Sequence, residues 1–381
     1  VAGGGYVANE LSLLDNPDVF DTFDYLAYDA GYGALASIIE ALESGNTAQT
    51  LWQVRFRDKA TGTVVAAGFD PQDNPRVATL ESVAIADVHP DYAGLHSGSY
   101  LRIVDSANPM HRLWNDTPWL KYRLAYGCYW HRCAFCDTQL DYIARFAPAS
   151  LESLLAAADA ASSSTGLYGI HFVDEAMPAR HVRAFATANT SRRRPFTFWG
   201  NVRFDRSWDE KTCRAAAEGG LIAVSGGVEI ATGAGLAMVD KGFGIPDLVR
   251  TLAAFKRVGI LVHAYLMYGF PGQTDRDMAD AAEMTRVLLA EGLVDSAFWH
   301  KFVLTRHSAL YGRWEKGEVP GLEPRIPASG FALNDLRFTG EEDSDKWTGV
   351  LDAALSTWAE EGRTEVPLQA FLPKGDRKSV V

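Results

Sequence analysis

Three of the four cysteines in this 381-residue sequence lie within nine positions, at Cys128, Cys133 and Cys136. Three thiolates on one loop can bind three irons of a [4Fe–4S] cluster and leave the fourth iron without a protein ligand. An open iron of that kind can bind a substrate. The same segment also contains His131, so that one histidine and three cysteines could instead close a tetrahedral structural zinc site.

The spacing favours the iron–sulfur interpretation over zinc, and buried thiols without a metal are the third alternative. All four ligands lie on one segment, whereas structural zinc usually joins two segments. The remaining Cys213 lies in "DEKTCRAAAEGG", where we expect a small buried apolar residue on an outer helix. A cluster of three cysteines plus a separate one indicates a metal site in a reducing compartment rather than a disulfide framework.

Repeated strand and helix patterns surround the cysteines and must position them. From residue 118 onward, apolar strands alternate with helices, which predicts a parallel α/β array with ligands at the carboxyl ends of the strands. We expect a partial (β/α)6 barrel resembling a TIM barrel over residues 118–305. The candidate strands are "YRLAYG", "GIHFVDE", "TFWGNVRF", "LIAVSGGVEI", "LVHAYLMYGF" and "SAFWHKFVL".

The segments outside this array are less regular. Residues 1–48 read as two β-α units, beginning with a strand in "VAGGGYV", and predict the remnant of a doubly wound, Rossmann-like domain. Because the chain begins at Val1 within this pattern, we expect a longer parent chain to supply preceding strands. Residues 49–117 predict a hairpin across a Thr-Gly turn and then an irregular connector. In the extension at 306–381, "FALNDLRF" is the only clear strand, and we assign the extension no role.

Composition narrows the class of protein. The formal net charge of −12 argues against a nucleic-acid partner, and small-molecule or peptide substrates are expected instead. No apolar run reaches the roughly 18–20 residues needed to cross a bilayer, and no basic segment leads into an apolar one at the N-terminus. We therefore expect no membrane partner and a cytoplasmic location.

The motifs together resemble the radical S-adenosylmethionine (radical SAM) superfamily. Its common pattern is C-x3-C-x2-C with an aromatic residue before the last cysteine; here Phe135 matches, and the first gap is one residue longer. The resemblance implies cofactor contacts at the ends of the second, fourth and fifth strands. The matching positions lie in "HFVDEAMP", "VSGGVEI" and "YGFPGQT", and they are Asp174, Glu175, Ser225, Glu229, Gly269 and Gly272.

The N-terminal segment adds a looser resemblance to the cobalamin-binding domain that precedes many radical SAM barrels. The histidine motif D-x-H-x-x-G of some cobalamin domains is absent, because "DVHPDY" has Tyr92 in place of the glycine. The resemblance implies a [4Fe–4S] cluster, S-adenosylmethionine and, in this branch, cobalamin. It further implies reductive cleavage to a 5′-deoxyadenosyl radical, an electron donor resembling flavodoxin or ferredoxin, and methyl transfer to an unactivated carbon.

Candidate catalytic residues follow from the alternation of strand side chains, which places every second residue on one face. His263 and Tyr265 share a face of their strand, and His300 lies on the next strand. Arg203 lies on the third strand, on the same face as Asn201. Each histidine could handle substrate protons or be a hydrogen-bonded core residue. Arg203 could pair with Glu229, with the methionine carboxylate, or in a strand-end salt bridge.

Two other functions remain open from the sequence. One is a zinc-stabilised barrel that acts as a binding or assembly protein, and the other is a degenerate barrel that binds S-adenosylmethionine without cleaving it.

Overall fold

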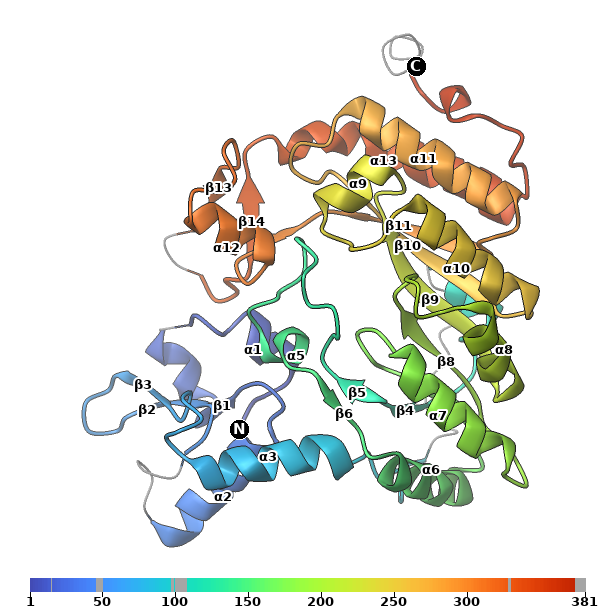
Figure 1. Ribbon diagram of the computed structural model, residues 1–381. Helices are drawn as coiled ribbons and strands as arrows, with labels where there is room; N and C mark the ends of the chain where they lie inside the picture. The colour runs from blue at the N-terminus through green and yellow to red at the C-terminus, as the bar shows by residue number, and fades with distance from the viewer. Residues whose placement is uncertain (15, 46–50, 97–98, 100–107, 328–329, 374–381) are drawn as a thin grey trace.

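Six parallel strands in chain order form the central sheet of the computed structural model (Figure 1). The structure describes residues 1–14, 16–45, 51–96, 99, 108–327 and 330–373. The sheet order is the chain order, so each strand pairs with the one before it. The strands are β4 (Leu120–Tyr122), β7 (Gly169–Phe172), β8 (Thr197–Val202), β9 (Leu221–Glu229), β10 (Leu261–Tyr268) and β11 (Ser296–Lys301).

Helices connect these strands and cover the outer face of the sheet (Figure 1). Parallel strands require such crossovers, which agrees with the alternation seen in the sequence. Side-chain caps fix where several of the helices begin: Ser150, Asp209 and Thr274 each accept a hydrogen bond from a backbone N–H of the first turn. The helices are α6 (Leu151–Thr165), α7 (Ala179–Thr190), α8 (Glu210–Glu218), α9 (Gly233–Met238), α10 (Ile245–Arg257) and α11 (Asp275–Ala290).

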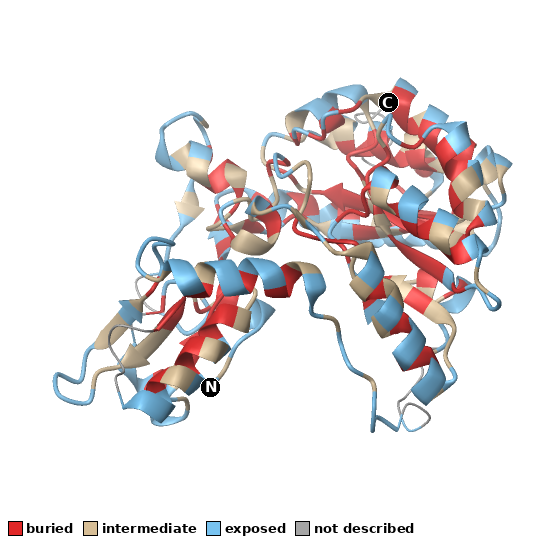
Figure 2. Cartoon of the chain, turned by 60° about the horizontal axis from the view of Figure 1, so that its bottom comes forward, coloured by how far each residue is buried: buried red, intermediate tan, exposed pale blue. Residues whose placement is uncertain are grey.

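The two faces of the sheet differ in chemistry. Apolar side chains such as Phe172 and Phe198 belong to the large buried core beneath the helices. The inner face carries polar groups in register, since Asn201 pairs with Ser225 and Ser225 with His263 on adjacent strands. A polar inner face suits a ligand cavity better than a packed core. Figure 2 shows the buried residues concentrated along the sheet and the facing sides of its helices.

The N-terminal segment forms a separate three-stranded antiparallel sheet in the order β1-β2-β3. The predicted hairpin is confirmed as β2 and β3, and it continues the sheet of β1 across the boundary we expected at 48/49. The predicted strand in "VAGGGYV" is wrong: Ala2 makes only an isolated parallel bridge to Leu26, and a helix follows the turn at Gly4. The elements are α1 (Gly5–Asn9), η1 (Pro17–Asp21), β1 (Tyr25–Ala27), α2 (Tyr32–Ser44), β2 (Val54–Arg57) and β3 (Val64–Ala67).

The expected irregular connector contains a regular helix, α3 (Pro75–Asp87), and the short α4 (Met110–Leu113). Asn74 caps α3 by accepting from the N–H of Val77, and Pro75 occupies the first helical position. Asn followed by Pro is a helix-start signal that could have predicted α3. Residues 97–98 and 100–107 of the expected connector lie outside the described residues.

The C-terminal extension packs partly along the edge strand β11 and the helix α11, and partly beyond the carboxyl end of the sheet (Figure 1). "FALNDLRF" contains the strand β14, as expected, but the extension also forms helices that the sequence analysis missed. No helix in the described part of the chain is long and apolar enough to span a membrane. The elements are β12 (Leu304–Thr305), α12 (Ala309–Glu315), β13 (Pro324–Arg325), β14 (Asp335–Phe338), η3 (Glu341–Ser344), α13 (Asp345–Leu355), η4 (Ser356–Glu360) and η5 (Leu368–Ala370).

Candidate functional site

The three clustered cysteines line one cavity of about 180 Å³, together with the carboxyl ends of β8 and β9. Cys133 is buried, whereas Cys128 and Cys136 are half-buried. The separate Cys213 is buried on α8, as expected, and its thiol faces the carbonyl of Trp208. The local spacing therefore does bring Cys128, Cys133 and Cys136 to one wall of one cavity.

The loop that carries these cysteines is the segment from Gly127 to Ala144, here called the cysteine loop. It includes the short α5 (Asp141–Ala144) and lies between β5 (Ala125–Tyr126) and β6 (Ala147–Pro148), which pair antiparallel. At Gly127, with φ of 77°, a Cβ atom would lie 1.6 Å from the carbonyl oxygen of Arg145. Only glycine fits this position.

Asp174 anchors the chain just before the cysteine loop. Its carboxylate accepts hydrogen bonds from the backbone N–H groups of Leu124 and Ala125 at 2.9 and 2.8 Å. Burial raises the pKa of Asp174 to about 7, although these hydrogen bonds lower it. Asp174 does not line the cavity, whereas its neighbour Glu175 does, and burial raises the pKa of Glu175 as well.

The thiols of Cys133 and Cys136 interact directly. A hydrogen bond from Cys136 lowers the pKa of Cys133 to about 6, against the effect of burial, and the cations of Lys241 and Arg203 lower it further. The same hydrogen bond raises the pKa of Cys136. The thiolate is the form that binds metals, so this environment favours a metal ligand at Cys133.

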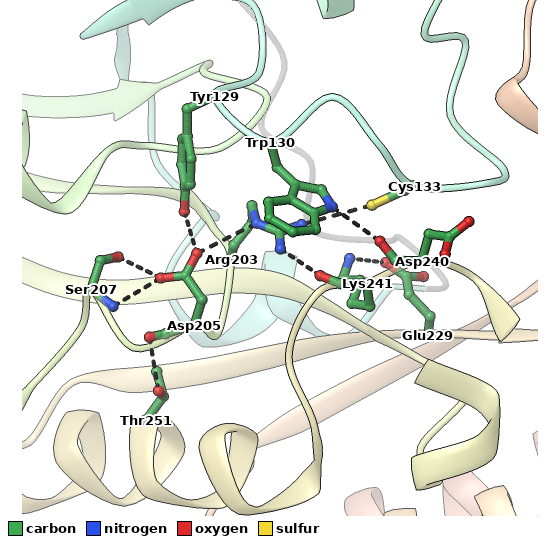
Figure 3. A network of polar contacts seen from close by, with 10 residues as sticks. All are labelled: Tyr129, Trp130, Cys133, Arg203, Asp205, Ser207, Glu229, Asp240, Lys241 and Thr251. Atoms are coloured by element: carbon green, nitrogen blue, oxygen red, sulfur yellow. Dashed lines mark hydrogen bonds and ion pairs between the residues drawn. The ribbon is translucent and has the colours of Figure 1, made fainter. Parts of the chain in front are cut away.

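Arg203 lies beside Cys133 within a cage of aromatic rings (Figure 3). Its Nη1 is 3.7 Å from the Cys133 sulfur, and its side chain is only 5% exposed. The guanidinium carbon lies 4.5, 5.6 and 5.9 Å from the ring centres of Trp130, Phe243 and Tyr129. Cation–π contacts of this kind stabilise a buried guanidinium, so a permanent positive charge is held next to the cysteines.

Asp205 is the anionic partner of Arg203 (Figure 3). Its Oδ2 lies 3.5 Å from Nε of Arg203 and accepts a hydrogen bond from the Tyr129 hydroxyl at 2.9 Å. Burial, together with this carboxylate, raises the pKa of Tyr129. Of the three alternatives for Arg203, the strand-end salt bridge is the one observed, and its partner is Asp205 rather than Glu229.

Glu229 pairs instead with Lys241, which the sequence analysis did not single out (Figure 3). Lys241 Nζ lies 2.7 Å from Glu229 Oε1, and both side chains are almost fully buried in the cavity wall. Burial alone would lower the pKa of Lys241, but the Glu229 carboxylate and Cys133 raise it more, and the net shift is upward. Lys241 follows α9 in a turn without a recognisable motif, so no sequence signal indicated its role.

Backbone strain gathers around this cavity. His131, Glu229 and Asp240 all have positive φ values, of 39°, 58° and 50°. They are three of the five non-glycine residues with positive φ in the described chain. Residues in such conformations cost free energy and concentrate at functional sites.

The other predicted residues fall at different depths. Phe135, Asn201 and Tyr265 line the cavity with the cysteines. Ser225 is fully buried beneath it, where its hydroxyl donates to Asn201 Oδ1. His300 is exposed, and its ring centre lies 5.7 Å from that of Tyr265.

His263 lies deeper in the sheet than the cavity. It is fully buried and its Nδ1 is 2.8 Å from the Ser296 hydroxyl. Burial lowers its pKa to about 3, so the ring is neutral at ordinary pH. These properties match the hydrogen-bonded core histidine that we weighed as the alternative to a catalytic role.

Gly269 and Gly272 lie in a second cavity, of about 250 Å³, between the end of β10 and the C-terminal extension. The N–H of Gly269 donates to Gln273 Oε1 at 2.9 Å, which closes the "GFPGQT" turn on itself. A Cβ atom at Gly269 would lie 2.6 Å from the Ser344 hydroxyl oxygen. The structure therefore does not bring these two glycines into the cavity of the cysteines.

The donor set suits an iron–sulfur cluster chemically. Three thiols line one cavity, one with a lowered pKa, and two buried cations stand beside them. Each thiol of such a cluster binds a different iron, so the three need not converge on one ion. Within the described ranges, no group of three His, Cys, Asp or Glu side chains converges on a single metal ion. His131 also lines the cavity, and its Nδ1 lies 3.0 Å from the carbonyl oxygen of Cys128.

Comparison with known proteins shows the fold. No protein-family model matches the chain, and no curated protein matches it in sequence. Among solved structures, it is similar to the radical S-adenosylmethionine methyltransferase TsrM from Kitasatospora setae, solved with cobalamin and a [4Fe–4S] cluster. The match has a TM-score of 0.60 at 14% identity and covers 93% of this chain and 69% of TsrM.

The cobalamin-dependent S-adenosylmethionine radical enzyme OxsB, solved with aqua-cobalamin, gives a TM-score of 0.62 at 13% identity. The match covers 91% of this chain and 54% of OxsB, so the chain spans about half to two thirds of the length of these enzymes. The chain therefore has the fold of cobalamin-dependent radical S-adenosylmethionine enzymes, which confirms the resemblance inferred from its motifs.

Proposed function

We propose that the protein is a radical SAM enzyme whose cluster is held by Cys128, Cys133 and Cys136. The observation that carries this proposal is that the three thiols line one cavity at the carboxyl ends of parallel strands. That end of the sheet is where α/β enzymes of this architecture bind their ligands. A [4Fe–4S] cluster bound there would supply the electron that splits S-adenosylmethionine into methionine and a 5′-deoxyadenosyl radical.

The residues of the chain then have distinct tasks. Arg203 holds a positive charge against Cys133, and the Glu229–Lys241 pair fixes the adjoining part of the cavity wall. Glu175 is the carboxylate best placed for the methionine ammonium group, because it lines the cavity whereas Asp174 binds backbone. Phe135 and Tyr265 shield the cavity from water, which protects a reactive radical.

The remaining predicted contacts are less direct. Ser225 would act through Asn201, which it supports from below. Gly269 and Gly272 would shape the rim through the turn that they form. His300 is the exposed candidate for proton handling near Tyr265, and it would act only on a substrate that reaches the rim.

We further infer that the reaction is methyl transfer to an unactivated carbon of a small molecule or peptide. Support comes from the fold shared with TsrM and OxsB, and on the same basis we assign residues 118–305 to a partial (β/α)6 barrel and residues 1–48 to the remnant of a cobalamin-binding domain. His89, the histidine of "DVHPDY", lies 3.0 Å from the Ser153 hydroxyl and is not presented as a cobalt ligand.

Anaerobic reconstitution with iron and sulfide tests the proposal. We expect a broad absorbance near about 400 nm, lost when Cys128, Cys133 or Cys136 is changed to alanine. Cys213→Ala is the matched control, because Cys213 is buried outside the cavity, and it should keep the absorbance. Tight stoichiometric zinc without this band would instead support a zinc-stabilised binding or assembly protein.

Product analysis addresses the reaction itself. With a flavodoxin-like or ferredoxin-like donor or a chemical reductant, the reconstituted protein should release 5′-deoxyadenosine from S-adenosylmethionine. Binding of S-adenosylmethionine without 5′-deoxyadenosine would identify a degenerate barrel. Methyl transfer would be contradicted if added methylcobalamin neither binds nor changes the products.

A further inference from the structure

The C-terminal extension forms one wall around the cysteine loop. The N–H of Ala309 donates to the carbonyl of Cys136 at 3.1 Å, and that of Leu310 donates to Ala134 at 2.8 Å. In the opposite direction, the N–H of Gln139 donates to the carbonyl of His307 at 3.2 Å. The loop thus exchanges backbone hydrogen bonds with residues 307–310 of the C-terminal extension. The side-chain contact between Thr305 and Asp137 joins the same two segments, which are 168 positions apart at that contact.

Asp137, which directly follows Cys136, is the side chain at which these contacts converge. Its Oδ1 accepts from the Thr305 hydroxyl, and its Oδ2 accepts from Asn334 Nδ2 at 3.0 Å. Both donors come from the C-terminal extension or its boundary. Fixing both carboxylate oxygens fixes the backbone that presents Cys136.

Asn334 is 3% exposed and uses its polar groups in three directions. Besides the bond to Asp137, its Oδ1 accepts from the N–H of His307 at 3.3 Å. Its own backbone N–H donates to Glu10 Oε2 at 3.1 Å. Glu10 belongs to the N-terminal unit, by which we mean the β1-β2-β3 sheet with α1, η1 and α2. One residue therefore touches the cysteine loop, the C-terminal extension and the N-terminal unit.

Other contacts reinforce this junction. The Ser12 hydroxyl lies 2.6 Å from Nε2 of His307, and Asn9 Nδ2 donates to the Tyr142 hydroxyl at 3.4 Å. The carbonyl of Glu10 also accepts from the N–H of Leu333 at 3.1 Å. The N-terminal unit thus reaches the cysteine loop both through Asn334 and at its far end.

We propose that Asn334 is a positioning residue that holds the cysteine loop through Asp137 and couples that loop to the N-terminal unit through Glu10. This inference concerns the metal-free chain and stands apart from the proposed function. It gives the C-terminal extension a role, namely to shape the loop that carries the cysteines.

Hydrogen exchange of the metal-free chain, residues 1–381, tests whether Asn334 holds the cysteine loop. Asn334→Ala removes the donor to Asp137, and Asn334→Asp places a second carboxylate against it, so both should raise exchange of residues 133–142 tenfold or more. Alkylation of Cys136 should accelerate likewise, while that of buried Cys213 should not. The matched control is Asn189→Ala, since Asn189 is a buried asparagine with three hydrogen bonds to backbone away from the loop.

The control separates local loosening from general instability. If Asn189→Ala raises exchange of residues 133–142 as much as Asn334→Ala does, or if both Asn334 variants exchange like the wild type, the positioning role is refuted. These exchange measurements use the chain without iron. Refutation of the positioning role is therefore distinct from failure of the protein to form a cluster.

Glu10→Ala tests the coupling. Glu10 accepts from the backbone N–H of Asn334 and repels the Asp137 carboxylate. Its loss relieves that repulsion, so the several-fold rise in exchange of residues 133–142 that we expect would come through the lost contact with Asn334. Glu341→Ala is the control, because Glu341 Oε2 accepts from the N–H of Phe338 at the other end of β14. Increased exchange confined to residues 5–14 and 333–335 in Glu10→Ala would overturn the coupling.

Discussion

The guanidinium of Arg203 and the thiol of Cys133 are neighbours, with Nη1 3.7 Å from the sulfur. The two residues are 70 positions apart and come from different loops at the carboxyl end of the sheet. If Cys133 binds the proposed cluster, a buried and permanently charged group beside it stabilises added negative charge on that cluster.

Arg203→Gln should make the reconstituted cluster harder to reduce. Loss of a nearby positive charge disfavours the more negative, reduced state, so we expect the midpoint potential to fall by tens of millivolts. A shift of about 59 mV changes the equilibrium constant of a one-electron reduction tenfold. Electron paramagnetic resonance at set potentials measures the shift. Arg203→Lys should recover part of it, and Arg206→Gln, with its side chain 80% exposed, should show none. Equal potentials in all four proteins would contradict this role.

Lys241→Met should destabilise the protein strongly. The substitution leaves the Glu229 carboxylate buried without its partner, and breaking a buried pair costs about 3–5 kcal/mol. Denaturant unfolding measures the loss. The double variant Glu229→Gln with Lys241→Met should be more stable than Lys241→Met alone, because the unpaired charge is gone. Additive losses would show that the pair is not coupled.

Gly242→Ala should dislodge Trp130 and weaken the Arg203 cage. At Gly242, φ is 77° and a Cβ atom would lie 2.0 Å from the Trp130 ring. Gly259 is a matched control, since its φ is 78° but a Cβ there meets open space. Gly259→Ala should cost only the backbone strain of about 1–2 kcal/mol, and Gly242→Ala more. Tryptophan fluorescence and unfolding measure both, and equal losses would argue against close packing at Trp130.

Acid should destabilise the fold through His263. Its folded pKa of about 3 lies below the ordinary value of 6.5, so the unfolded state binds the proton more readily. Stability is therefore fully present above about pH 6.5 and falls as the pH drops toward 3, by up to about 3 kcal/mol at pH 4.

His263→Gln tests this pH dependence by unfolding at several pH values. The variant should lose part of the decline between pH 6.5 and 4. Another part should remain, because burial also lowers the pKa of His171 to about 3. His96→Gln, which changes an exposed histidine, should keep the wild-type slope. An unchanged slope in His263→Gln would show that this histidine is not buried in neutral form.

Local patterns in the sequence were sufficient to predict the sheet and the cysteine loop. Hydrophobic strands and capped helices repeat in chain order, and the spacing of Cys128, Cys133 and Cys136 requires only one loop to bring the thiols together. The helix α3 lies where the composition predicts an irregular connector, although Asn74 and Pro75 signal its start. The opening glycines suggest part of a strand, whereas the positive φ of Gly4, at 93°, turns the chain into a helix.

The partners around the cysteines were decided only by the tertiary structure. Which cation meets Glu229, which carboxylate holds Arg203, and which amide holds Asp137 depend on how separate loops pack at one end of the sheet. The Asn334–Asp137 contact joins residues 197 positions apart. A sequence specifies that buried charges and amides need partners, but with several candidates available, only the packing of the elements selects among them.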